Sequence, residues 1–149
     1  KSTQPRSSDL KQGRSQRPSK SAVPRIQKRI IKAVQSLPEA AATAFGNGQV
    51  SLEVRGKRFG WFLVDHNGDG RVALNLKAAR GTNKTLSERH PDRYHIPKYL
   101  GPHGWIGLWL DRPTVDWKEV SSVIEAAYQL TAPKSLLAGA RLTVGVPVR

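Results

Sequence analysis

Hydrophobic residues recur at every third or fourth position in the segment 24–38, which begins and ends with proline. This spacing places them on one side of an α-helix, and prolines are common in the first turn of a helix and just past its end. The segment therefore predicts an amphipathic helix with basic residues on its polar side. Its apolar positions are Ile26, Ile30, Val34 and Leu37, and its basic positions are Arg25, Lys28, Arg29 and Lys32.

The next part of the chain carries the pattern of β-strands. Residues 50–54 and 59–64 are strand-like, and the four residues RGKR between them supply the glycine of a hairpin turn. Every second residue of the segment 71–76 is a valine or leucine, which predicts a third strand with one apolar face. The apolar run 105–110 predicts a fourth strand. Strands in this order favour an antiparallel sheet.

Two further helices are expected. Thr82 can cap a short helix that ends before Pro91. A longer helix can begin at either of two caps, Thr114 or Asp116, and continues to about residue 131. Its apolar residues fall on one stripe, as in a helix packed on a sheet. That stripe comprises Trp117, Val120, Val123, Ile124, Ala127, Tyr128 and Leu130.

These elements predict an α+β fold. We expect an antiparallel sheet of four to five strands packed against an N-terminal and a C-terminal helix in two layers. Residues 24–138 form the predicted domain, and its length is sufficient to bury one hydrophobic core. Residues 1–23 form a predicted tail, and residues 139–149 either add an edge strand or form a second tail.

The charge of the chain changes this picture most. Its 149 residues include 25 Lys and Arg against 11 Asp and Glu, a net charge of +14, which favours a polyanionic partner. Ten of the basic residues and one acidic residue lie within positions 1–35. Because residues 1–23 contain almost no aliphatic side chains to bury, they predict a disordered basic arm. Such an arm either binds a polyanion or is a solubilising tail or cloning remnant.

Several classes of protein are not favoured. The absence of cysteine excludes disulfides and thiol chemistry and agrees with a reducing compartment, so we expect a cytoplasmic protein. No apolar run reaches the ~18 residues of a membrane span. The residues DHNGDG at 65–70 resemble the start of a calcium loop, but Leu76 stands where the bidentate acid belongs, so we expect a hairpin turn.

No metal, cofactor or catalytic residues are expected. The glycines of FGNG precede a predicted strand instead of opening a helix, so they do not form a dinucleotide-binding loop. His90, His95 and His103 lie in one segment, but their spacing matches no metal site. The chain also has no recognisable nucleophile or acid–base pair, so we do not expect an enzyme.

The segment 90–111, HPDRYHIPKYLGPHGWIGLWLD, combines aromatic residues with cations among glycines and prolines. Aromatic faces stack on bases and cations contact phosphates, so this composition suits nucleic-acid binding. The alternative is a structural anchor, in which the aromatic residues pack between loop and strand. Tyr94, Tyr99 and Trp105 alternate here with Arg93, Lys98 and His103.

The same segment resembles a known family. Residues 96–107, followed by Leu110 and Asp111, look like the central signature of the MmcQ/YjbR proteins, and the helix ending in Ala132-Pro133-Lys134 resembles that family's C-terminal helix. The resemblance covers about residues 26–138. It implies a compact fold like that of the bacterial frataxin CyaY or of secretion chaperones, and a family generally labelled DNA-binding.

The leading functional hypothesis is binding of nucleic acid, most simply double-stranded DNA, with low sequence specificity. The basic arm and first helix would contact phosphates, and the folded domain would add a basic face. A second hypothesis is a non-enzymatic protein-interaction module that uses the sheet and the aromatic loop. The predicted nucleic-acid-binding residues are Lys20, Arg25, Lys28, Arg29, Lys32, Arg55, Lys57, Arg58, Arg93, Lys98, His103, Trp105 and Lys134.

Overall fold

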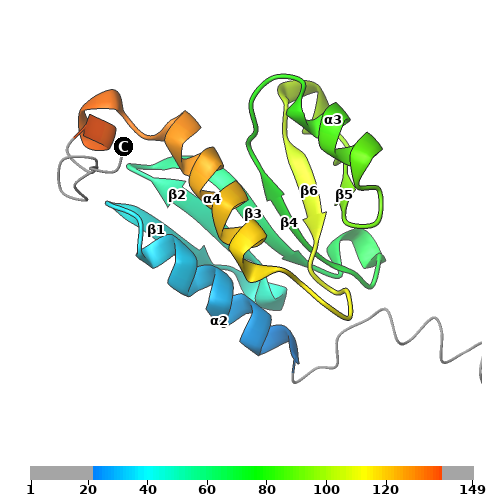
Figure 1. The fold of residues 1–149 in the computed structure, drawn as a ribbon. Coiled ribbons are helices and arrows are strands. Elements are labelled where there is room, and N and C mark those ends of the chain that lie inside the picture. The colour runs from blue at the N-terminus through cyan, green and yellow to red at the C-terminus, as the bar shows by residue number, and fades with distance from the viewer. Residues whose placement is uncertain (1–21, 139–149) are drawn as a thin grey trace, which may run out of the picture.

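The computed structural model describes residues 22–138. Residues 1–21 of the predicted arm, with Lys20, and the predicted C-terminal strand or tail 139–149 lie outside this range. The arm was predicted to extend to residue 23, but Ala22 and Val23 already belong to the first helix. The described chain forms one six-stranded antiparallel sheet with helices α2, α3 and α4 and a short helical segment at residues 134–138 (Figure 1). The strand order is β1-β2-β3-β4-β6-β5. The predicted α+β class and antiparallel sheet are confirmed.

The bounds of the elements follow the predicted segments closely. The helices are α2 (Ala22–Gln35), α3 (Thr82–Arg89) and α4 (Trp117–Thr131). The strands are β1 (Ala40–Ala44), β2 (Val50–Val54), β3 (Lys57–Val64), β4 (Val72–Leu76), β5 (Tyr94–His95) and β6 (Ile106–Trp109). Single 3-10 turns are η1 (Gly46–Gly48), η2 (His66–Gly68) and η3 (Gly101–His103).

The sheet has more strands than the four to five predicted. The segment of β1, AAATA, shows no alternation of apolar and polar side chains, so its sequence carries no strand signal. It becomes a strand because it pairs in register with β2, with Ala42 opposite Leu52. β5 has two residues and exists through its pairing with β6. Both extra strands lie at the edges of the sheet and depend on tertiary pairing.

Local signals set the turns and helix ends. The β2–β3 hairpin turns through Arg55 and Gly56, which both have positive φ (49° and 80°), as a type I′ turn requires. Asp116 is the cap of α4, since its carboxylate accepts hydrogen bonds from the backbone N–H groups of Lys118 and Glu119. The cap of α3 is Gly81 and not Thr82, which is already the first helical residue.

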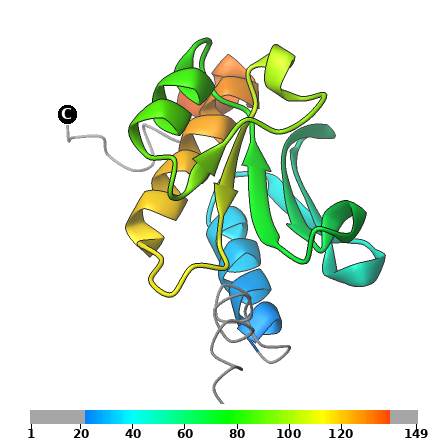
Figure 2. The ribbon, with the colours of Figure 1, turned by 90° about the vertical axis from the view of Figure 1, so that its right-hand side faces the viewer.

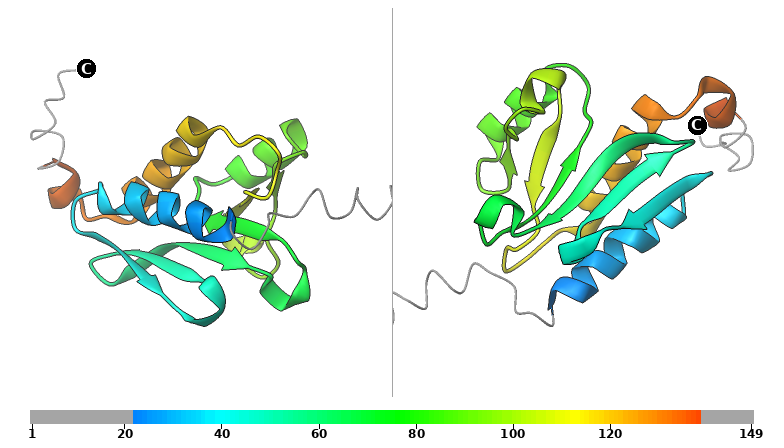
Figure 3. Two further views of the ribbon diagram at one scale, coloured as in Figure 1. Left: turned by 90° about the horizontal axis from the view of Figure 1, so that it is seen from below. Right: turned by 180° about the vertical axis from the view of Figure 1, so that it is seen from behind.

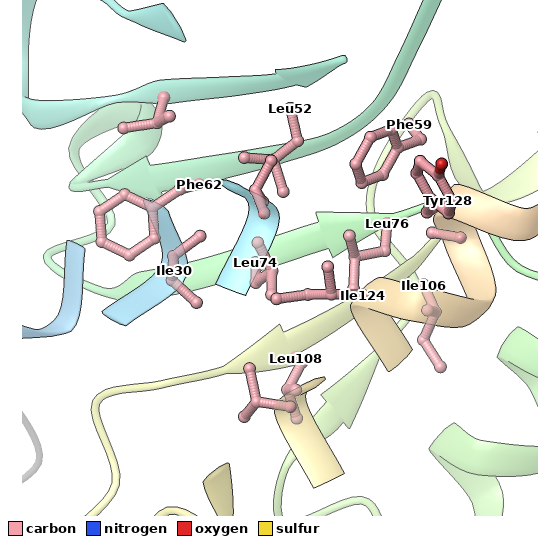
Figure 4. Packing of buried hydrophobic residues seen from close by; sticks show 14 of the residues in the cluster. Ile30, Leu52, Phe59, Phe62, Leu74, Leu76, Ile106, Leu108, Ile124 and Tyr128 are labelled. Atoms are coloured by element: carbon pink, nitrogen blue, oxygen red, sulfur yellow. The ribbon is translucent and has the colours of Figure 1, made fainter. Parts of the chain in front are cut away.

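The core lies between the sheet and helices α2 and α4 (Figure 4). Ile30 and Phe62 are fully buried there, and the rings of Phe59 and Tyr128 meet edge to face with centroids 5.9 Å apart. Burying each such side chain contributes roughly 1.5–3 kcal/mol. The predicted stripe of α4 is confirmed for its buried members, but Leu130 is 53% exposed because it falls at the border of the stripe.

The helices all cover one face of the sheet. Figure 3 shows α2 and α4 on the same side, and the view from behind shows strands with no helix in front of them. α3 contacts β5 and β6 at the far edge of the sheet, beside the last turns of α4 (Figure 2). The opposite face of the sheet, called the open face below, is therefore left to side chains and loops.

Candidate nucleic-acid interface

The polar side of α2 presents a stripe of four cations. Arg25, Lys28, Arg29 and Lys32 follow each other at helical spacing, and all four are exposed. Within residues 22–138 none of them forms an ion pair with a carboxylate. Because Ile30 and Val34 anchor the other side of the helix in the core, these charges are held toward solvent. This stripe, called the α2 basic face below, was predicted from the sequence.

One end of the α2 basic face opens into a groove of about 430 Å³. Arg25 and Arg29 line it from α2, Arg112 lines it from the segment after β6, and Trp117 lines it from the start of α4. The guanidinium of Arg29 lies 4.9 Å from the ring centroid of Trp117, a cation–π contact that orders the arginine. The groove thus gathers three arginines.

Arg112 was not among the residues predicted from the sequence. Its side chain is 22% exposed, and one nitrogen lies 3.8 Å from the carboxylate of Asp92, at the limit of an ion pair. The sequence carries no signal that would place it beside Arg25 and Arg29, more than 80 positions earlier, because only the packing of α2 on the sheet brings them together.

The basic tip of the β2–β3 hairpin lies at the other end of α2. Arg55 forms a bidentate ion pair with Glu39, with distances of 2.7 and 3.1 Å, and this hydrogen bonding lowers the pKa of Glu39. Its charge is therefore already matched by a carboxylate. Lys57 and Arg58 are exposed, and the Arg58 guanidinium stacks on Trp61 at 4.2 Å.

The aromatic loop supplies fewer surface contacts than its composition predicts. Arg93 pairs with Glu119 at 3.0 Å, and the Tyr94 hydroxyl donates to the same carboxylate at 2.8 Å. Trp105 is 7% exposed and so offers almost no ring surface for stacking. Arg93, Tyr94 and Trp105 therefore pack as the alternative prediction of a structural anchor expects. Lys98, His103 and Lys134 are exposed, and Lys134 lies beyond the C-terminal end of α4.

The structure therefore divides the predicted residues among separate places. α2 and the hairpin tip do not form one compact site, because a 14-residue helix spans about 21 Å and Arg25 and the hairpin tip lie at opposite ends of it. The α2 basic face places four cations without carboxylate partners among residues 22–138 along one side of a single helix.

The open face carries a second set of residues that the sequence analysis did not single out. Ser51, Trp61, Asn75, Gly107 and His95 lie in one row across β2, β3, β4, β6 and β5. The sequence signal was present as alternation: Asn75 lies between Leu74 and Leu76, which point into the core, so its side chain must point the other way.

Three side chains form a stack beside this row. The His95 ring lies 3.9 Å from the Trp109 ring at 19°, and the Arg71 guanidinium lies 3.9 Å from the Trp109 centroid. Arg71 also forms a bidentate ion pair with the buried carboxylate of Asp111, at 2.7 and 2.9 Å. Burial, and then the charge of Arg71, lower the pKa of His95 to about 4, so this histidine is neutral at pH 7.

Among residues 22–138, no group of three His, Cys, Asp or Glu side chains is placed to hold a metal ion. Over the same part of the chain, no helix has the length and apolar character needed to cross a membrane.

The domain has an open antiparallel sheet, helices on one face of that sheet and an aromatic-rich loop that joins β5 to β6. These features define a small α+β domain of the kind that the signature at residues 96–107 implies. A family model, YjbR, matches residues 35–130, and the chain belongs to the YjbR family.

Solved structures with a similar fold come from two bacterial species. A Deinococcus radiodurans protein with a DUF419 domain aligns with 20% identity and a TM-score of 0.57, covering 78% of this chain and 85% of that chain. A Pseudomonas syringae protein aligns with 15% identity and a TM-score of 0.57, covering 70% of this chain and 97% of that chain. At these identities the similarity shows the fold alone. No curated protein matches the sequence.

Proposed function

We propose that this protein binds double-stranded DNA with low sequence specificity through the α2 basic face. The observation that supports this most directly is the stripe of four exposed cations that have no carboxylate partner among residues 22–138. Helical cations at this spacing can contact successive phosphates. Phosphate contacts carry no sequence information, so such binding should show low sequence specificity. The proposal is a binding activity and not a catalytic one.

The groove at the end of α2 adds to this surface. Arg29 is ordered by Trp117, so less side-chain entropy is lost when it contacts a phosphate. Arg112 extends the positive surface across the groove from the other side. The basic N-terminal arm, with Lys20 and five more Lys and Arg in the first 20 residues, would add further phosphate contacts.

The salt dependence of binding tests the proposal. Each phosphate neutralised by a cation contributes about −0.9 to the slope of log K against log salt, so five contacts give a slope of roughly −4 to −5. Fluorescence anisotropy on a labelled duplex between about 50 and 200 mM salt measures it. Replacing Arg25, Lys28, Arg29 and Lys32 by Gln should reduce the slope by several units, and unrelated duplexes should bind alike.

A matched control removes the same number of charges elsewhere. Arg80, Lys84, Arg89 and Lys118 are exposed and form no ion pair among residues 22–138, so replacing these four by Gln tests the effect of net charge alone. This control variant should keep most of the parent's slope of log K against log salt. Equal losses in both variants would show a non-specific charge effect and contradict a site on α2. No binding by the parent at 50 mM salt would favour the protein-interaction module instead.

A further inference from the structure

The open face contains a pocket of about 580 Å³ between the sheet and the loop that follows β5. Leu63, Ala73 and Asn75 lie on the strands beneath it, and Trp61 and the His95–Trp109 stack lie on either side of them. Trp61 on β3 and Trp109 on β6 are two strand spacings apart across the sheet, about 9–10 Å, and are also offset by two residues along the strands, since Trp61 pairs with Asn75 and Trp109 with Ala73. This separation leaves room for a flat ring in the pocket.

The loop forms the rim of this pocket. Ile96 and Tyr99 are 48% and 83% exposed, which is unusual for large apolar side chains, and Lys98 lies between them. Tyr99 has a φ of 66°, in the left-handed region that a bulky residue seldom adopts. Such outliers persist at positions where binding uses them. The rim therefore holds aromatic, apolar and cationic groups ready for a ligand.

Two residues that line the pocket each carry a buried polar atom without a hydrogen-bond partner. Asn75 is 7% exposed, and its Oδ1 atom is buried without a partner. The Nδ1 atom of His95 is buried without a partner as well. Within residues 22–138 these are the two buried side-chain nitrogen or oxygen atoms in this state. Leaving such a group unpaired costs about 1–3 kcal/mol, so the pair needs an explanation other than stability.

The chemistry of these groups selects a class of ligand. A carboxamide carries a donor and an acceptor side by side and can pair with the edge of a nucleobase. A neutral imidazole adds one donor and one acceptor. Trp61 and Tyr99 can stack on a flat ring, and Lys98 at the rim, with Arg58 on Trp61, can meet a phosphate.

We propose that the open-face pocket binds an unpaired nucleobase, with Asn75 and His95 contacting its edge and Trp61 its face. This site lies on the face opposite α2 and does not depend on DNA binding by the α2 basic face. A duplex does not present a base in this way, since its bases are stacked and paired. The base can come from a free nucleotide or from a single-stranded nucleic acid.

Titration with nucleoside 5′-monophosphates tests the pocket, with ribose 5-phosphate as a control that has the phosphate but no base. Chemical shifts should change at the Asn75 side-chain amide and at the Trp61 and Trp109 indole N–H groups for at least one nucleotide below roughly 1 mM. Ribose 5-phosphate should leave them unchanged. Equal shifts with ribose 5-phosphate, or no shifts with any nucleotide and any single-stranded oligonucleotide, would overturn the proposal.

A titration with a single-stranded oligonucleotide identifies the source of the base. A single-stranded decamer that binds ten times more tightly than the mononucleotide would assign the site to single-stranded nucleic acid, and equal affinities would assign it to free nucleotides. Both results support a nucleobase site. The variant with four Gln substitutions on α2 should keep the mononucleotide shifts, so a failure of DNA binding on α2 and a failure of this pocket are distinguishable.

Two substitutions separate binding from folding. Asn75→Leu removes the unpartnered amide and fills a similar volume, so it should reduce nucleotide affinity at least tenfold while raising the midpoint of urea unfolding. His95→Phe preserves the ring over Trp109 and removes the nitrogen atoms, and should weaken binding in the same way. Unchanged affinity in both variants would refute the assigned contacts. Gln129→Leu, an exposed position on α4, serves as control and should alter neither quantity.

Discussion

His95 lies directly over Gly107, so that a Cβ atom at position 107 would overlap the imidazole ring. The two residues are paired across β5 and β6, and the absence of a side chain on Gly107 lets the ring cross the strand and stack on Trp109. One wall of the open-face pocket therefore depends on a glycine in the middle of a strand, where glycine is otherwise unfavourable.

Replacing Gly107 by Ala should destabilise the protein by about 1–3 kcal/mol, because the methyl group forces the His95 ring off Trp109. Urea unfolding followed by tryptophan fluorescence measures the loss. Gly46→Ala is the matched control, since nothing lies within 4 Å of a Cβ there and its φ is not in the left-handed region. Equal midpoints for the two variants would contradict this account of the His95 position.

Stability should fall as the pH drops from about 6.5 to about 4. The pKa of His95 is lowered from 6.5 to about 4, so in this window the unfolded chain binds a proton that the folded chain does not. The full shift corresponds to about 3 kcal/mol, and solvent access to the ring reduces the expected effect to roughly 1–2 kcal/mol. Above pH 6.5 the contribution is fully present.

His95→Phe should remove this part of the pH dependence, because phenylalanine does not titrate. Arg71 and Asp69 also influence the ring, and both remain in the variant. Urea unfolding at several pH values between 4 and 7 gives the two slopes. Parallel slopes for parent and variant would show that His95 does not contribute to the acid sensitivity.

Removing either partner of the Arg71–Asp111 ion pair should be costly, because the carboxylate of the pair is buried. The Asp111 side chain is fully buried and also accepts a hydrogen bond from the backbone N–H of Val72 at 3.1 Å, whereas Arg71 is 31% exposed. Asp111→Ala should cost about 3 kcal/mol, because it leaves the Val72 N–H unsatisfied and the arginine unpaired.

Asp111→Asn preserves an acceptor for Val72 and should cost less than the alanine substitution. Arg71→Gln leaves the carboxylate buried without its cation and should be as damaging as Asp111→Ala. Unfolding free energies of the three variants check this order. A smaller loss for Asp111→Ala than for Asp111→Asn would contradict the role given to the Val72 hydrogen bond.

The cap of α4 can be tested at the two positions that the sequence left open. Asp116 accepts hydrogen bonds at 3.0 and 3.3 Å from the first turn of the helix, so Asp116→Ala should cost about 1 kcal/mol. Thr114 is exposed and forms no side-chain hydrogen bond among residues 22–138, so Thr114→Ala should change little. Equal effects, measured by thermal unfolding, would contradict the assignment of the cap.

Much of the fold could be predicted because its signals are local. The stripe of α2, the Arg55-Gly56 turn and the alternation in β4 each follow from the spacing of a few neighbouring residues. The cations of α2 were predicted for the same reason, since a helix with a buried side must expose its other side. The resemblance to the YjbR family implied a compact fold of this class, and the family match confirms the resemblance.

What only the tertiary structure decided depends on contacts between distant segments. β1 and β5 are strands through pairing and not through their own sequence pattern. Arg93 is neutralised by Glu119 and Arg55 by Glu39 because folding brings a carboxylate to each, which composition cannot show. The unpartnered Asn75 beside His95 likewise arises from strand register across β4, β6 and β5, and register is set by the whole sheet.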